Sequence, residues 1–389
     1  MKRNSTAALA LVALLTAGLT LGACSSTSSS SEDVWRVGLQ APLSGSQSAL
    51  GQGMLQGAQL AAADVNAAGG VLGRQIEIIA IDDAGDPETG VSAANAAIEQ
   101  GLNGVVGPYN SSVGLQTLPL YMTAGLVPIR LTSDNATEGM GITLQPMTSQ
   151  IAPVTTDALT KFFGAETVAI LFDPTQEYTK TAAATVKTQL EAANVTVTSY
   201  AEVQPGKDQA TYTSAVTAAN ADTPDAIYAA VYYPEGAKIA QAVTDLGTGQ
   251  NALPCLLDYS SYDTGYVQDA GATAAQACNV VGVPAPSDFA NSDPYVAAYT
   301  AEFNSSPGTW SPYTYDSVRI LVDTVASVGT WDTAALTSGL TSISNWNGWT
   351  GSVSIEAATG NRVPATVVVT QVNDAGALQV DPATPTPLR

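Results

Sequence analysis

Short apolar runs alternate with stretches of helical spacing along most of this chain, in two successive blocks. In the first block Met54, Ala58, Ala61 and Val65 recur on one face of a predicted helix. The predicted strands are 34–39, 75–81, 104–106, 127–131, 167–172, 195–200, 226–231, 253–257 and 279–283, with closing strands at 351–355 and 365–372. The other predicted helices are 86–100, 111–124, 178–193, 211–220, 235–246, 293–303 and 312–328. Strands that alternate with helices indicate parallel, doubly wound sheets, so the pattern predicts an α/β protein with two Rossmann-like lobes.

The predicted domain boundaries follow the two blocks. The first lobe takes in residues 34–152 plus 285–347, and the second lobe residues 153–284 plus 348–372. The chain therefore crosses between the lobes near 152, 285 and 348, and the Pro-rich tail 373–389 is expected to be loose. Ligands of doubly wound sheets bind at the carboxyl ends of the strands, so the cleft between the two lobes is the predicted site.

The start of the chain is typical of a secretory signal. A basic start precedes an apolar run, 7–20, that is shorter than the roughly 20 residues a membrane-spanning helix needs. Leu21-Gly22-Ala23-Cys24 resembles the lipobox of bacterial lipoproteins, and a Ser-rich linker, 24–33, follows. The resemblance implies a signal peptide, 1–23, lipid on the Cys24 thiol, and a protein that works outside the cytoplasm, lipid-anchored to the cell membrane. An ordinary secretion signal that happens to contain a cysteine is the alternative.

Composition narrows the function. The formal charge of -21 argues against nucleic acid or an anionic membrane surface as a partner, and a hydrophobic content of 45% excludes disorder of the main body. The chain has no histidine, which removes the commonest general base and the commonest metal ligand. We expect no catalytic residue, no metal site and no cofactor, and we expect a monomer.

Two cysteines remain besides Cys24. Cys255 and Cys278 belong to a chain predicted to work in an oxidising compartment, so we expect them to form a disulfide within the second lobe. Two buried free thiols are the alternative.

Five segments together resemble the substrate-binding proteins of ABC importers, specifically the branched-chain amino-acid-binding group with the type I periplasmic binding protein fold. They are Ala41-Pro-Leu-Ser-Gly45, Asp64 to Arg74, Asp82-Asp83 with Asp86-Pro87, Gly107 to Ser112, and Tyr232 to Glu235. The resemblance implies two lobes joined by a hinge, which close on a small molecule and hand it to an ABC permease in the membrane. The implied ligand is an amino-acid-like zwitterion: a branched-chain or other amino acid, or an amide or urea analogue.

The turn before the predicted helix at 111–124 offers a carboxylate site. A helix start carries free backbone N–H groups and a partial positive charge, which hold a carboxylate without Arg or Lys. The hydroxyls of Ser111 and Ser112 can add donors. In the family that this chain resembles, a serine here binds the ligand carboxylate. A plain helix cap is the alternative.

The next strand end supplies Ser133 and Asp134. The resemblance implies that groups here hold the carboxylate and the ammonium of the ligand. Asp134 stands where threonine is usual, which either strengthens ammonium binding or marks a different ligand; a turn cap is the alternative. Arg130, at the same strand end, either pairs with Asp134 or reaches an acid group of the ligand.

The second lobe is expected to close over the ligand with Tyr178 and Tyr232. Aromatic rings suit this task because they bury area with little loss of rotamer freedom. Asp258 is the implied partner of the ammonium, with Tyr259 as its competitor if the alignment slips by one residue. The ligand side chain is expected to contact Leu50, Tyr109, Tyr178 and Tyr232. Ordinary packing of each tyrosine is the alternative.

Two other functions stay open. The same fold serves as a ligand-sensing module for a membrane receptor or regulator, and fold alone does not decide between transport and sensing. A secreted hydrolase is the third possibility, because the 34 acidic residues offer many carboxylate pairs of the kind that glycosidases use.

Overall fold

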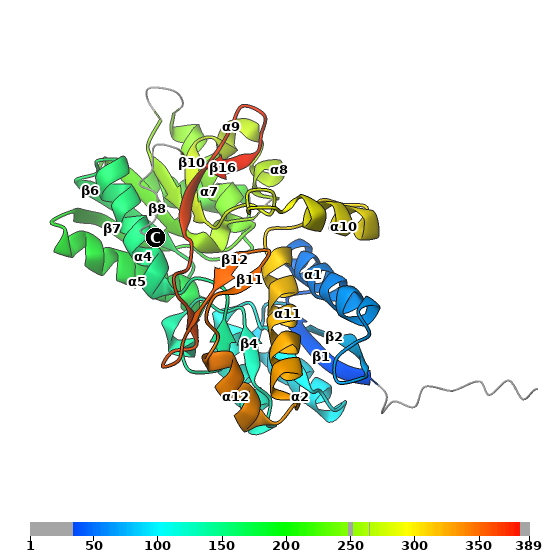
Figure 1. Cartoon of the computed structure of the whole chain (residues 1–389). Coiled ribbons are helices and arrows are strands. Elements are labelled where there is room, and N and C mark those ends of the chain that lie inside the picture. The colour runs from blue at the N-terminus through cyan, green and yellow to red at the C-terminus, as the bar shows by residue number, and fades with distance from the viewer. Residues whose placement is uncertain (1–33, 248–251, 264, 382–389) are drawn as a thin grey trace, which may run out of the picture. The chain divides into compact units, whose positions relative to one another are not determined.

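The computed structural model describes residues 34–247, 252–263 and 265–381, which form two large sheets flanked by helices (Figure 1). The predicted signal peptide 1–23, the predicted lipidation site Cys24 and the linker 24–33 lie outside the described residues. Each large sheet has seven strands. We call each sheet, with the helices that pack on it, a lobe. The predicted α/β fold with two doubly wound lobes is confirmed.

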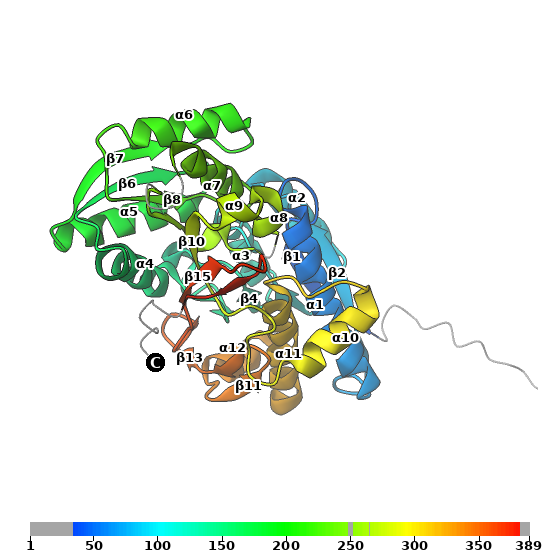
Figure 2. The ribbon, with the colours of Figure 1, turned by 90° about the horizontal axis from the view of Figure 1, so that it is seen from above.

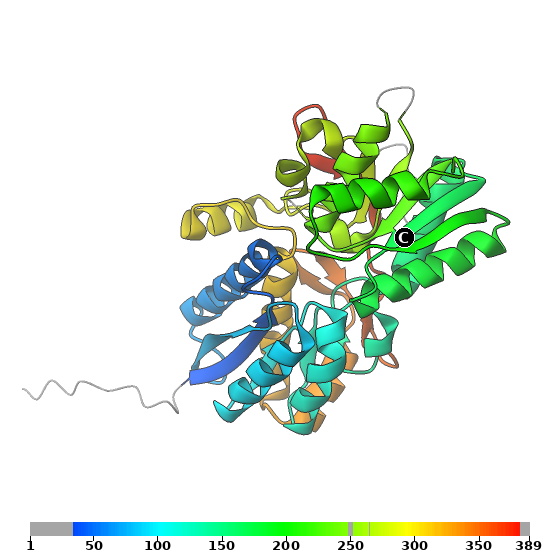
Figure 3. The same cartoon turned by 180° about the vertical axis from the view of Figure 1, so that it is seen from behind.

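The first lobe is built on a sheet with the strand order β13-β14-β5-β4-β3-β1-β2, in which β1 to β5 are parallel. Helix α1 packs against α11, and α2 packs against α3 (Figures 1 and 3). Its strands are β1 (Val34–Ala41), β2 (Gln75–Asp82), β3 (Gly104–Val106), β4 (Pro128–Arg130), β5 (Ile142–Thr143), β13 (Ile355–Glu356) and β14 (Asn361–Arg362). Its helices are α1 (Ser48–Ala67), α2 (Pro87–Glu99), α3 (Ser111–Thr123), α10 (Asp293–Phe303), α11 (Ser311–Val328) and α12 (Thr333–Thr341), and the hairpin of β11 (Trp346–Gly348) and β12 (Gly351–Val353) lies beside α11.

The second lobe repeats this plan with the order β16-β15-β10-β9-β8-β6-β7. Strands β6 to β10 are parallel, and the antiparallel hairpin of β15 and β16 pairs beside β10 (Figure 2). Its strands are β6 (Thr167–Phe172), β7 (Thr196–Glu202), β8 (Ala226–Ala230), β9 (Cys255–Leu257), β10 (Cys278–Gly282), β15 (Val368–Val372) and β16 (Leu378–Val380). Its helices are α4 (Thr148–Asp157), α5 (Glu177–Ala192), α6 (Gln209–Ala219), α7 (Glu235–Leu246), α8 (Tyr266–Ala270) and α9 (Ala272–Ala275).

Burial explains why the central strands consist of continuous apolar runs. All five residues of β8 are fully buried, because this strand has neighbours on both sides and helices on both faces. The edge strand β7 is only partly covered, and its Tyr200 is exposed. Local chemistry fixes the helix starts as expected: the Asp86 side chain accepts a hydrogen bond from the Thr89 N–H, with Pro87 as the first residue of α2.

Two predicted boundaries need correction. The strands β13 and β14 still belong to the first sheet, so the last crossing lies between Arg362 and Val368 rather than near 348. Two-residue strands are too short to show a periodicity, which is why the sequence pattern missed them. The tail 373–389 is not loose throughout, because β16 pairs with β15 and extends the second sheet.

The predicted disulfide is confirmed. Cys255 and Cys278 open the neighbouring strands β9 and β10, lie directly opposite each other, and are bonded, with 4.5 Å between their Cα atoms. The bond therefore ties two adjacent parallel strands of the second lobe at their amino ends.

Candidate functional site

The start of α3 lies at the carboxyl edge of the first sheet, next to the loop that follows β4. The Ser111 side chain is buried, and its hydroxyl oxygen accepts a hydrogen bond from the Asp134 N–H at 3.2 Å. Asn110 occupies the N-cap position, but its side chain donates to Gln47 at 3.1 Å and makes no capping bond within the described chain. The first turn of α3 thus retains backbone donors, as a carboxylate site requires.

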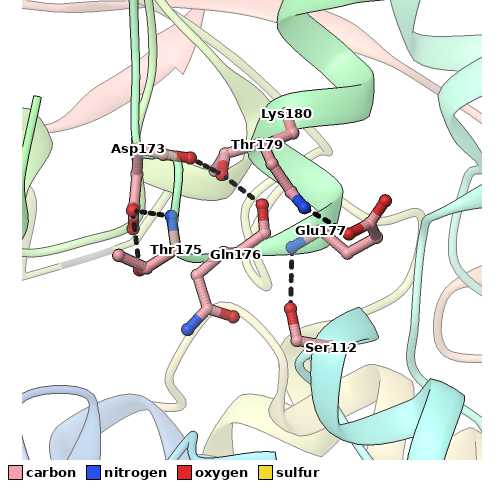
Figure 4. Close-up of polar contacts among 7 residues, drawn as sticks. All are labelled: Ser112, Asp173, Thr175, Gln176, Glu177, Thr179 and Lys180. Atoms are coloured by element: carbon pink, nitrogen blue, oxygen red, sulfur yellow. Dashed lines mark hydrogen bonds and ion pairs between the residues drawn. The ribbon is translucent and has the colours of Figure 1, made fainter. Parts of the chain in front are cut away.

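Ser112 makes a contact that the sequence did not predict. Its hydroxyl oxygen accepts a hydrogen bond from the Glu177 N–H at 2.7 Å (Figure 4). Glu177 is the first residue of α5, and the preceding Gln176 makes no side-chain cap in the described part of the chain. A serine of the first lobe therefore caps a helix of the second lobe.

The loop that presents this N–H group is held by its own hydrogen bonds. One carboxyl oxygen of Asp173 accepts from the Thr175 N–H and hydroxyl, both at 2.7 Å. The Thr179 hydroxyl lies 2.6 Å from the Asp173 carbonyl oxygen, and the Lys180 ammonium lies 2.6 Å from the Glu177 carboxylate (Figure 4). The contact with Ser112 consequently joins two locally ordered segments.

Asp134 has the turn-cap role that was one alternative for it, and its second carboxyl oxygen is free of protein partners in the described chain. Its Oδ1 accepts a hydrogen bond from the Ala136 N–H at 2.7 Å and so caps a short 3-10 helix, 135–137. Its Oδ2 is buried and has no hydrogen-bond partner among the described residues. Ser133 beside it is also buried, with its hydroxyl 3.5 Å from Gln145 Oε1. One oxygen of Asp134 thus remains available to a ligand donor.

Arg130 is not paired with Asp134 in the described structure. Its guanidinium donates to Asn361 Oδ1 at 2.6 Å and to the Thr359 carbonyl oxygen at 3.1 Å. Burial lowers the pKa of Arg130 to about 10, while the charge of Glu138 acts in the opposite direction. Arg130 therefore fastens β4 to the segment around β14.

Asp258 is fully buried at the carboxyl end of β9, with both oxygens engaged. Oδ1 accepts from the Tyr228 hydroxyl at 2.6 Å, and Oδ2 accepts from the Ser260 N–H and hydroxyl, both at 3.0 Å. Burial raises the pKa of Asp258, and these hydrogen bonds oppose the rise. The Tyr178 hydroxyl also lies near enough to lower the pKa of Asp258, although its geometry is too poor for a regular hydrogen bond.

Five buried aromatic side chains meet where the lobes are in contact, and we call them the aromatic cluster. Tyr109 follows β3 and Trp310 precedes α11 in the first lobe, whereas Tyr178, Tyr232 and Tyr259 belong to the second lobe. Rings from opposite lobes approach closely: the centroids of Tyr109 and Tyr232 are 6.1 Å apart, and those of Tyr259 and Trp310 are 5.2 Å apart. The structure thus brings together Tyr109, Tyr178 and Tyr232, the three tyrosines expected to contact the ligand side chain, and Tyr259, the alternative to Asp258, joins them.

Trp310 and Leu50 also lie near the site or in the core beside it. Trp310 was not predicted as a site residue, because it reaches the loop after β3 only in the folded protein. Its position directly before the Ser-Pro start of α11 was the signal in the sequence that placed it at the end of a helix. Leu50 lies on the buried face of α1, within the hydrophobic core.

Carboxyl groups dominate the electrostatics of the aromatic cluster. Burial raises the pKa of Tyr109 and Tyr232, and the charge of Asp258 raises both further. Asp134 acts in the same way on Tyr232, from the opposite lobe. Asp263 lies near Tyr109, and its own pKa is raised to about 6 by burial. The site is therefore a negative, largely apolar environment.

A surface cavity of about 500 Å³ lies beside the contact between Ser112 and Glu177. It is lined from the first lobe by α2 and α3 and from the second by Thr175 and Glu177. Within residues 34–247, 252–263 and 265–381, no group of acidic or cysteine side chains has the arrangement of a metal site. None of the helices in this described part combines the length and the apolar content needed to cross a membrane.

Comparison with known proteins gives consistent matches. Residues 34–377 match a family model described as periplasmic binding protein. A Leu/Ile/Val-binding protein of Rhizobium johnstonii is 32% identical over 222 residues, and the match covers 56% of this chain and 60% of that relative. The chain thus spans about 60% of the length of this relative.

Solved structures show the same fold. A leucine-binding protein of Thermotoga maritima superposes with a TM-score of 0.79 at 21% identity and covers 89% of this chain and 97% of its own. A solute-binding protein of an ABC transporter from Rhodopseudomonas palustris, in complex with 3,4-dihydroxybenzoic acid, gives a TM-score of 0.80 at 20% identity, with coverages of 92% and 98%.

Proposed function

This chain belongs to the periplasmic binding protein family, and we propose on that basis that it is the extracytoplasmic solute-binding component of an ABC importer. It captures a small amino-acid-like zwitterion between its lobes and delivers it to a membrane permease. We further propose that it is a monomer anchored by lipid on Cys24, and that it releases its ligand chemically unchanged.

The arrangement around α3 carries the proposal. The ligand carboxylate binds the backbone donors at Ser111, and the ammonium binds Asp134 Oδ2, the buried oxygen that has no hydrogen-bond partner in the described chain. Both groups lie at the carboxyl edge of the first sheet, where the doubly wound architecture binds ligands. Since Tyr228 and Ser260 occupy Asp258, that residue acts on the ammonium through its charge rather than by direct contact.

The second lobe supplies the cover. Tyr178 and Tyr232 contribute their rings from the side opposite Ser111, with Tyr109 between them and the first sheet. We propose that the lobes rotate about the crossings near 152 and 285 and the segment between Arg362 and Val368. Only the closed form contacts the ligand from both lobes, so ligand binding stabilises it.

Purified protein should be heated with a panel of amino acids, amides and urea. Ligand at 100 times its dissociation constant adds about 2.7 kcal/mol to the free energy of unfolding, which raises the melting temperature. Mass spectrometry of the released ligand should recover it unchanged. A flat response to the whole panel contradicts the proposed ligand class, and a converted ligand contradicts a purely binding role.

A further inference from the structure

The helix α4 contacts both lobes, and its first turn is bound to the first lobe. The carbonyl oxygen of Ser133 accepts hydrogen bonds from the Thr148 N–H at 2.7 Å and from the Thr148 hydroxyl at 3.0 Å. The Ser149 N–H donates to Asn135 Oδ1 at 3.2 Å. The first two N–H groups of α4 are therefore capped by the loop that carries Asp134, the residue proposed to bind the ligand ammonium.

Gln150 joins the same turn to the last crossing of the chain. Its Nε2 donates to the Arg362 carbonyl oxygen at 2.9 Å, and its Oε1 accepts from the Met147 N–H at 2.9 Å. Arg362 ends β14 in the first sheet, and its guanidinium donates to the Thr350 carbonyl oxygen at 2.6 Å. The first turn of α4 thus has hydrogen bonds to two separate segments of the first lobe.

The rest of α4 packs in the second lobe. Thr156 donates its hydroxyl to Gln189 Oε1 of α5 at 2.9 Å, and α4 also contacts β10 and β15. Pro153 lies between the two sets of contacts, three residues after Gln150 and three before Thr156, and it is exposed. Because proline has no N–H, position 153 cannot donate the helical hydrogen bond to the Ser149 carbonyl oxygen. The helix α4 can therefore bend here without breaking a hydrogen bond at this position.

We propose, resting on the proposed function, that α4 is a hinge element of the protein and that Pro153 is its pivot. The half of the helix before Pro153 moves with the first lobe, and the half after it moves with the second lobe. The anchored half is bonded to the loop 133–135, so the ligand site and the base of the pivot form one continuous unit. A ligand that fixes Asp134 thereby also fixes the base on which the second lobe turns.

The test measures the distance between the lobes in ligand-free protein. Spin labels on Ala96→Cys in α2 and Ala184→Cys in α5, two exposed positions of opposite lobes, report this distance by pulsed electron paramagnetic resonance, with Cys24→Ser to prevent labelling there. Pro153→Ala restores the missing N–H, so bending has to break a hydrogen bond that the wild type lacks. We expect the ratio of the long-distance, open population to the short-distance, closed population to fall at least twofold. An unchanged distribution overturns the pivot.

The helix α3 supplies a matched control, because it also contains an exposed proline. Pro119 lies inside α3 in the first lobe, away from the crossings of the chain. Pro119→Ala makes the same chemical change as Pro153→Ala and should leave the distance distribution as it is in the wild type. An equal shift in both variants overturns the assignment of the pivot to α4.

A further variant tests the anchor. Thr148→Val combined with Gln150→Glu removes both side-chain donors to the first lobe, while the carboxylate keeps an acceptor for the Met147 N–H. The distance distribution should broaden, whereas Thr148→Ser, which keeps the hydroxyl, should match the wild type. An unchanged width in the double variant overturns the anchor. These measurements use no ligand, so their failure is distinct from a flat melting response to the amino-acid panel, which contradicts the proposed function.

Discussion

Ser112 is expected to control how readily the lobes close. Its hydroxyl oxygen caps α5 across the contact, at 2.7 Å from the Glu177 nitrogen, and α5 has no side-chain cap from its own N-cap residue, Gln176. Loss of a helix cap costs about 1 kcal/mol, and this cap exists only while the lobes touch. Ser112→Ala should therefore lower the closing equilibrium about fivefold and weaken the apparent affinity by the same factor when the open form predominates. Isothermal titration calorimetry on the wild type and the variant measures this change in apparent affinity.

Two controls sharpen this test. Ser112→Thr keeps the hydroxyl and should bind close to wild type. Adding Gln176→Asp to Ser112→Ala gives α5 a cap of its own, which should restore the free energy of unfolding but leave the affinity low. Wild-type affinity in Ser112→Ala refutes the reasoning. A loss that varies from ligand to ligand also refutes it, because that result shows Ser112 touching the ligand rather than the opposite lobe.

Three other predictions concern stability. Replacing Cys255 and Cys278 with serine should lower the free energy of unfolding by about 2–4 kcal/mol in urea titrations, and a change below about 0.5 kcal/mol contradicts a structural role for the bond. Burial raises the pKa of Asp83 to about 7. Its contribution to the free energy of unfolding is therefore present below about pH 4 and is lost as the pH rises toward 7. Asp83→Asn should reduce the fall of the urea midpoint with pH over this range. If the urea midpoint of Asp83→Asn falls with pH as steeply as that of the wild type, Asp83 does not titrate in this pH range. Gly57→Ala should destabilise by more than about 1 kcal/mol, because the new Cβ would lie 2.1 Å from a backbone oxygen of α11, whereas Gly53→Ala, with its nearest atom at 3.6 Å, should be tolerated. Equal melting temperatures for the two variants contradict this reading of the helix contact.

The sequence predicted most of the regular structure because its signals are local. The predicted helices at 235–246 and 293–303 have the observed bounds of α7 and α10, and β3 has its predicted bounds as well. Apolar periodicity and end signals such as Asp86 act within a few residues, so they can be read directly from the chain. Helix α12 was missed because only Leu336 and Leu340 of its nine residues form its buried face, which is too short a repeat to show helical spacing.

The site was less accessible to sequence reasoning because it depends on contacts between distant segments. Tyr109, Tyr178 and Tyr232 were found through a resemblance, and the structure brings them together. The contact of Ser112 with the other lobe was not predicted, because its partner Glu177 lies 65 residues further along the chain. Trp310 approaches Tyr109 from 201 positions further along the chain, a separation at which no local pattern gives a signal.

The last crossing of the chain between the lobes, from Arg362 to Val368, limits how far the lobes can move apart. Arg130 anchors the segment around β14 to the first sheet, and β15 is held in the second sheet by pairing with both β10 and β16. Five residues link β14 to β15, and a fully extended linker of this length spans about 20 Å. This link therefore limits how far the two lobes can separate when the protein opens. A larger separation would require β14 or β15 to detach from its sheet.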